Sequence, residues 1–197
     1  VSVPSDGVEG QSVAIAWTGG NQGDLPTPAS WTDRVYLSLD SEFDGGDTLV
    51  GSRVQVGAVA PGGTWNAGLA VTLPTSLVGQ SVYAIVVAAA LDGIEEGTGD
   101  ANNAKASSTK LAIATAPKPN LVPSIASLPT SWLAGSTVQV GWQVDNAGNA
   151  EAEGPWSDGV YLSADAVLSS DDETLRVQQF SGDLAAAANY TRTAAVT

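Results

Sequence analysis

The sequence contains no cysteine, no histidine and no methionine. Without cysteine the chain forms no disulfide, so its stability must come from packing or from bound cations. Without cysteine and histidine it has no Ser-His-Asp or Cys-His catalytic group and no histidine-ligated zinc site. It also has no phosphate-binding loop of the Walker or dinucleotide type. A glycosidase-like carboxylate pair is not excluded by composition, but nothing singles out such a pair, and we expect no enzyme.

Basic residues are scarce as well, with 7 Lys and Arg against 21 Asp and Glu and a net charge of −14. A chain this acidic offers no cationic surface to nucleic acid or to an anionic membrane. Its longest apolar run, Val82 to Leu91, is too short to span a bilayer. We therefore expect neither nucleic acid nor membrane insertion, whereas cation binding fits the charge.

The chain repeats itself at an offset of 125 residues. Between residues 10–47 and 135–172, aligned without a gap, 13 of 38 positions are identical. The clearest block, Val35-Tyr36-Leu37-Ser38, recurs as Val160-Tyr161-Leu162-Ser163. Two tryptophan pairs also recur in register: Trp17 with Trp142, and Trp31 with Trp156. A repeat of this length indicates two tandem copies of one module.

Apolar and polar residues alternate in each copy, as in Ser12 to Thr18, where Val13, Ile15 and Trp17 share one face. Such alternation predicts a strand with one buried face. In the first copy we predict strands at Ser12 to Thr18, Asp33 to Ser38, Leu49 to Val56, Thr64 to Leu73, Ser81 to Ala90 and Ser107 to Ala114. Turn residues separate them, which predicts an all-β protein of tandem immunoglobulin-like β-sandwich modules. The Ala185 to Ala188 run allows one helical turn at most.

The first module is expected at residues 1–116, without its first strand, and the second at 121–197, without its last strands. The linker, residues 117–120, contains two prolines that favour an extended connection. The second copy opens with an additional strand, Leu121 to Ala126, and stops at the equivalent of Thr72. We expect the parent chain to continue in both directions. Otherwise strands from another chain must complete the second module by β-addition.

The pattern Trp-x-Asp-x-Val-Tyr-Leu-Ser-x-Asp, at Trp31 to Asp40 and at Trp156 to Asp165, resembles the CARDB module, a cell-adhesion-related domain found in bacteria. Pro119-Asn120-Leu121 and Asp100-Ala-Asn-Asn fit the same family, although Asn120 stands where Asp is more common. The resemblance covers nearly the whole chain. It implies an immunoglobulin-like sandwich, tandem arrays in large secreted or surface proteins, and no catalytic residues.

Acidic residues gather in three loops that form the candidate cation sites. The first loop carries acidic residues at alternate positions, then two glycines and a further aspartate: Asp40, Glu42, Asp44 and Asp47. This spacing allows a turning loop to direct several oxygens to one Ca²⁺. The repeat of this loop carries Asp165, Asp171 and Asp172. The third loop carries Asp92, Glu95, Glu96, Asp100 and Asn103 beside the module boundary. The alternative for all three is that Asp, Asn and Gly simply form turns. Asp33 and Asp158 we expect to accept backbone hydrogen bonds where their strand begins.

Six tryptophans raise a second hypothesis, because sugars stack on flat aromatic rings. Trp17 and Trp142 lie on apolar strand faces and are expected in the core, as are Trp31 and Trp156. Trp65 and Trp132 do not recur as tryptophan and are the candidates for surface contact. The main hypothesis is a non-catalytic structural or adhesive module of a secreted or cell-surface bacterial protein. Its partners are neighbouring modules and a surface glycan or protein. The alternative is a carbohydrate-binding accessory module of an extracellular enzyme.

Overall fold

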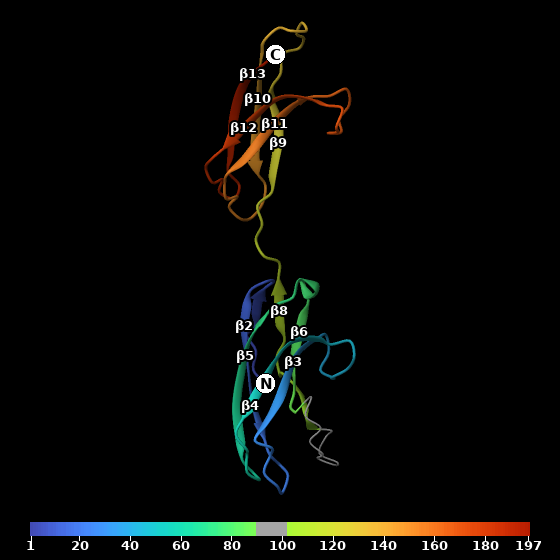
Figure 1. Ribbon diagram of the computed structural model, residues 1–197, viewed down its shortest axis with the longest axis vertical. Coiled ribbons are helices and arrows are strands. Elements are labelled where there is room, and N and C mark those ends of the chain that lie inside the picture. Colours follow the sequence, from blue (N-terminus) through green and yellow to red (C-terminus); the bar gives the residue numbers. More distant parts are fainter. Residues whose placement is uncertain (90–101) are drawn as a thin grey trace. The chain divides into compact units, whose positions relative to one another are not determined.

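The computed structural model describes residues 1–89 and 102–197, and its regular secondary structure is β-strand apart from one short 3-10 turn (Figure 1). Its elements are β1 (Asp6–Val8), β2 (Ser12–Gly20), β3 (Ser30–Ser38), β4 (Thr48–Val56), β5 (Thr64–Thr72), the 3-10 turn η1 (Thr75–Leu77), β6 (Ser81–Val87), β7 (Ala104–Ala106), β8 (Leu111–Ala114), β9 (Leu121–Ser127), β10 (Val138–Asn146), β11 (Trp156–Leu162), β12 (Glu173–Phe180) and β13 (Asn189–Val196). The all-β prediction is confirmed. In these two ranges no helix has the length and apolarity needed to cross a membrane.

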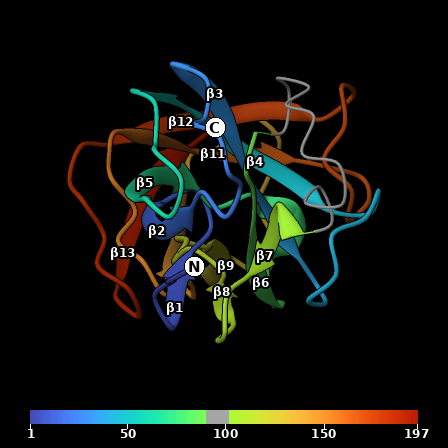
Figure 2. The same ribbon diagram turned by 90° about the horizontal axis from the view of Figure 1, so that it is seen from below.

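The chain divides into two compact units, Val1–Ala116 and Pro117–Thr197. In the first unit, one sheet has the strand order β1-β8-β6-β3-β4, with β7 added to β6, and a second sheet pairs β2 with β5. β2 and β5 lie side by side in both views (Figures 1 and 2). The strand that enters this unit, β1, runs parallel to the strand that leaves it, β8, whereas its other strand pairs are antiparallel.

The core of the first unit lies between these two sheets. Alternating side chains supply it from both sides, as the period of two requires. Its buried residues are Ile15 and Trp17 of β2, Val35 and Leu37 of β3, Val71 and Leu73 on and after β5, Val82, Ala84 and Val86 of β6, and Leu111 and Ile113 of β8. β6 and β8 thus contribute five of the eleven residues, so the core depends on them.

In the second unit β10 lies between β9 and β13, and β11 pairs with β12. These strands repeat the pairing of the first unit at the offset of 125. Val138 pairs with Val196 as Val13 pairs with Val71. Even the bulge recurs, between Val35 and Tyr36 on β3 and between Val160 and Tyr161 on β11. The buried cluster is smaller here, with Trp142, Val144 and Ala194.

Some predicted boundaries were wrong. Of the strand predicted over Ser107 to Ala114, only Leu111–Ala114 (β8) is a strand, and the unpredicted β7 ends just before it at Ala106. The chain turns between β7 and β8, where the Ser107 hydroxyl accepts the Ala84 N–H at 3.1 Å and donates to the Thr109 carbonyl at 2.7 Å. The strand predicted to reach Ala90 ends at Val87. The sequence reading also missed β1, a three-residue strand without clear alternation.

Candidate functional site

The first acidic loop uses its carboxylates to hold its own backbone. Asp40 accepts the Glu42 N–H at 2.9 Å, and Asp44 accepts the Gly46 N–H at 2.7 Å. Asp47 accepts the Asp44 N–H at 3.0 Å from the other end of the loop. Asp and Asn side chains commonly stabilise turns in this way. Three of the four carboxylates of this loop, those of Asp40, Asp44 and Asp47, are therefore already engaged in turn-forming hydrogen bonds.

The second copy of this loop repeats the pattern although its sequence has diverged. Asp165 accepts the Val167 N–H at 2.7 Å, and Asp172 accepts the Ser169 N–H at 2.7 Å. The Ser169 hydroxyl donates to Asp171 and lowers the pKa of that carboxyl. The pKa of Asp172 is lowered as well, first by the Ser163 hydroxyl and then by the Ser169 N–H. The divergence replaced residues between the capping carboxylates and preserved their geometry.

The remaining predicted ligands are separated from these. Asp92, Glu95, Glu96 and Asp100 lie outside the described residues. Asn103 lies inside, and its backbone carbonyl accepts the Ala88 N–H at 2.9 Å. Across residues 1–89 and 102–197, no three acidic side chains come together in a group that could hold a metal ion.

A Trp–Asp hydrogen bond joins the two sheets of each unit, buried in the first unit and partly buried in the second. In the first unit the Trp17 indole N–H donates to Asp33 at 2.8 Å, and in the second the Trp142 indole donates to Asp158 at 2.9 Å. Asp33 is fully buried and also accepts from the Trp31 indole at 3.0 Å and the Gln55 amide at 3.0 Å. The sequence predicted backbone partners for Asp33. One such bond is present, from Ala89 N at 3.3 Å, but side chains supply the other three donors.

In the second unit a tyrosine intervenes. The Tyr190 hydroxyl donates to Asp158 at 2.7 Å and accepts the Trp156 indole N–H at 3.1 Å. Burial, and then the hydrogen bond to Asp158, raise the pKa of Tyr190. In the first unit the Trp31 indole therefore donates directly to Asp33. In the second unit the Trp156 indole donates to the Tyr190 hydroxyl, which in turn donates to Asp158.

A second repeated side chain closes the loop after β2 and after β10. Asn146 is 1% exposed, and its amide donates to the carbonyls of Ala150, Leu184 and Ala185 at 2.8, 3.0 and 3.3 Å. Its oxygen accepts the N–H groups of Asn120 and Gly148 at 3.0 and 3.1 Å. Asn21 makes the equivalent bonds to Leu25, Val59 and Gly23. Asn21 and Asn146 occupy equivalent positions at the offset of 125, but their spacing alone does not indicate that each side chain joins separate segments of the chain.

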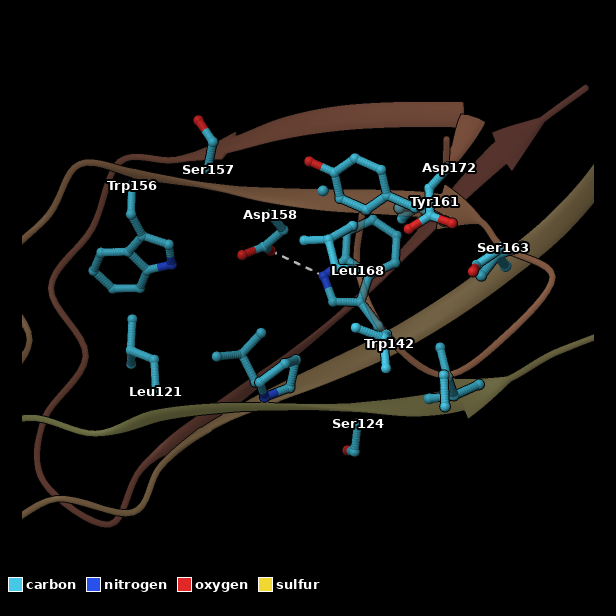
Figure 3. Close-up of a pocket in the computed structure, with 18 of the residues that line it drawn as sticks. Leu121, Ser124, Trp142, Trp156, Ser157, Asp158, Tyr161, Ser163, Leu168 and Asp172 are labelled. Carbon is cyan, nitrogen blue, oxygen red and sulfur yellow. Dashed lines mark hydrogen bonds between the residues drawn. The ribbon is translucent and has the colours of Figure 1, made fainter. Parts of the chain in front are cut away.

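The second unit also contains an open pocket of about 900 Å³. β9, β10, β11 and the loop after β11 line it, with apolar side chains such as Leu121, Val140 and Leu168. In Figure 3, Trp142 and Asp158 point toward one another in this pocket and are joined by their hydrogen bond. The first unit fills the corresponding region with β6 and β8.

No protein-family model matches this sequence, and no curated protein matches it.

Three of the four predicted core tryptophans are confirmed, since Trp17, Trp31 and Trp142 are almost completely buried, whereas Trp156 is only half-buried. Trp65, a candidate for surface contact, is also half-buried. Its ring packs edge-on against Trp31 at 5.0 Å between centroids and covers Gly19, where a Cβ would collide with it. Trp132 is half-buried too. The two candidates therefore present only part of their rings to solvent.

Calcium binding by the first acidic loop stays a prediction, and a thermal melt tests it. A dissociation constant of about 1 mM, typical of extracellular modules, gives about 1 kcal/mol of stabilisation at about 5 mM Ca²⁺. For a unit of this size that raises the midpoint by roughly 5 °C. Asp47→Asn should abolish the rise but keep the unfolding midpoint without calcium, because the amide oxygen still accepts the Asp44 N–H. An unchanged midpoint, together with no bound calcium by elemental analysis, contradicts the prediction.

Proposed function

We propose that both units are copies of one immunoglobulin-like β-sandwich module. Four strands of each unit support this, because β2, β3, β4 and β5 pair in the same register as β10, β11, β12 and β13. The first unit adds a core enclosed between two sheets. The resemblance to the CARDB module, carried by the block from Trp31 to Asp40 and its repeat, is part of the same proposal.

We further propose that the chain is a non-catalytic structural and adhesive element of a secreted or cell-surface bacterial protein. The side chains that recur between the units support an architectural role. The Trp–Asp pair joins sheets, the asparagine closes a loop, and the acidic residues cap turns. In the first unit Trp17, Trp31 and Asp33 are buried in the interior and bonded to one another, so these repeated residues serve packing there.

The parallel pairing of β1 with β8 is the observation that carries this role. The chain first meets the unit at Ser2, which is bonded to Ala16 of β2, then runs through β1, and it leaves the unit through β8. Once the Ser2 bonds have broken, tension on the two sides of the unit pulls β1 and β8 along their axes in opposite directions. The bonds between them include Ala112 N to Ser5 O at 2.9 Å and Glu9 N to Ala114 O at 3.0 Å. Because the strands slide rather than unzip, these bonds must break together, which gives the module resistance to pulling.

Stretching single molecules by their two ends tests the proposal. We expect the first unit to unfold in one step of about 40 nm, the extended length of Val1–Ala116 at about 3.6 Å per residue. We expect the second unit to unfold earlier, in a step of about 30 nm, because Ser131–Leu133, the equivalent of β1, is not a strand.

Two variants separate mechanical from thermal stability. Ala112→Pro removes the N–H that binds Ser5 and should lower the unfolding force of the first unit. Leu69→Ala, on β5 and away from this pair, should cost about 2 kcal/mol of thermal stability and leave the force nearly unchanged. A first unit that extends gradually, without a force peak, contradicts the proposal.

A further inference from the structure

β11 has one strand neighbour, whereas its equivalent in the first unit has two. β3 lies between β4 and β6, with residues Arg34 to Ser38 paired to Val87 to Tyr83. At the offset of 125 the corresponding residues are 159–163. In the part of the chain that the structure describes, β11 pairs with β12 alone. The edge of residues 159–163 therefore presents backbone groups that β6 satisfies in the first unit.

The same sequence block is buried in one unit and open in the other. Leu37 is 1% exposed, but its repeat Leu162 is 45% exposed. Leu133, the counterpart of Val8 beside β8, is 80% exposed. The loop after β11 adds Val167 and Leu168, both exposed. Val167 and Leu168 line the 900 Å³ pocket, as do Tyr161 and Ser163 on either side of Leu162 in the chain, so an open strand edge and an apolar cavity occur together.

The first unit indicates what fits this place. There β6 inserts Val82, Ala84 and Val86 into the core at alternate positions while its backbone pairs with β3. We propose that the pocket and the β11 edge of the second unit form an acceptor site for an extended strand. The strand runs antiparallel to β11 and places small apolar side chains at alternate positions, as β6 does.

Charge narrows the chemistry of this strand further. In the antiparallel register of β6, the strand begins beside Ser163, where Asp165 and Asp172 line the pocket. In the first unit Lys110 lies at the corresponding place, 4.8 Å from the centroid of the Tyr83 ring and 3.1 Å from the Leu39 carbonyl. A basic residue near the beginning of the strand therefore suits the site. A second copy of this chain suits it less, because each copy carries a charge of −14.

A peptide with the sequence of residues 80–88, extended by two lysines at its beginning for solubility, is the probe. We expect saturable 1:1 binding to the full 197-residue chain. Hydrogen exchange should slow at the amides of residues 159–163 and stay unchanged at residues 34–38, where β6 already lies. A scrambled peptide of the same composition should not bind.

Two matched controls test the mode of binding. Leu162→Lys should weaken binding of the peptide at least about tenfold, because the partly exposed leucine side chain can no longer pack against the peptide. Val177→Lys, at an exposed site on β12 that does not line the pocket, should leave the affinity unchanged. N-methylation of alternate peptide amides should abolish binding for one alternate set and spare the other, because a strand binds β11 along only one edge.

Three outcomes overturn the proposal. One is no binding, or binding that the scrambled peptide reproduces. Another is binding that is retained by both N-methylated peptides, since the pocket would then bind apolar side chains without backbone pairing to β11. The third is a dimer in sedimentation without peptide, with slowed exchange at residues 159–163, because a second copy would then occupy the edge.

Discussion

Asp33→Ala should lower the free energy of unfolding of the first unit by about 3–5 kcal/mol, a large part of the stability of a domain of this size. The substitution leaves the indole N–H groups of Trp17 and Trp31 and the amide of Gln55 without their acceptor. These groups are buried, and each unsatisfied donor costs about 1–3 kcal/mol. The two sheets also lose a side chain that links β2 to β3.

The second unit supplies a matched control. Asp158→Ala removes the same repeated position, but Asp158 is only half-buried and accepts from two side chains, Trp142 and Tyr190. We expect a loss of about 2 kcal/mol, confined to the second unit. Asp33→Asn keeps one acceptor oxygen and should fall between wild type and Asp33→Ala. Urea unfolding followed by hydrogen exchange in fragments of β2 and β10 assigns each loss to its unit.

An equal loss for Asp33→Ala and Asp158→Ala would contradict this account, because their burial and donor numbers differ. A loss below about 1 kcal/mol for Asp33→Ala would contradict it too, since three buried donors would then have found other partners.

Strand positions followed from the sequence because alternation reports a face that is buried against a second sheet. The alternation of Val13, Ile15 and Trp17 predicts a strand over Ser12 to Thr18, and β2 covers this range with two residues more. β1 could not be found this way, because three residues pairing with a distant β8 leave no periodic signal. Its partner lies more than a hundred residues further along the chain, so only the tertiary structure defines it.

The Trp–Asp pair illustrates what a repeat can and cannot reveal. Trp17 and Asp33 both recur 125 residues later, which a comparison of the copies detects. That they bind each other depends on β2 and β3 facing one another across the core, a relation that spacing along the chain does not encode. For the acidic loops, the sequence pattern is visible but fits more than one structure. Their spacing fits both a cation site and a capped turn, and the orientation of each carboxylate toward a backbone N–H is visible only in three dimensions.

Asn146→Asp should produce the largest loss in the second unit, about 3–4 kcal/mol near neutral pH. The change keeps the shape of the side chain and replaces an N–H₂ donor by an oxygen. That oxygen then faces the carbonyls of Ala150, Leu184 and Ala185, and the negative charge lies in a buried site. Loss of these bonds frees the segments before β11 and before β13 together.

The pH dependence separates charge from shape in this variant. Carbonyl neighbours and burial raise the pKa of the introduced carboxyl in the folded state above its unfolded value of about 4. Folding then favours the protonated form, so the penalty is small below about pH 4 and grows as the pH rises toward neutrality. Asn146→Ala loses these hydrogen bonds, and also those from the N–H groups of Asn120 and Gly148, without adding a charge. Its loss of stability should therefore not change over this pH range. Asn21→Asp, at the half-buried equivalent with two carbonyl partners, should show the same trend at roughly half the size. Urea unfolding at pH 4 and pH 7 measures all three, and a loss for Asn146→Asp that does not depend on pH would show that the charge is not buried.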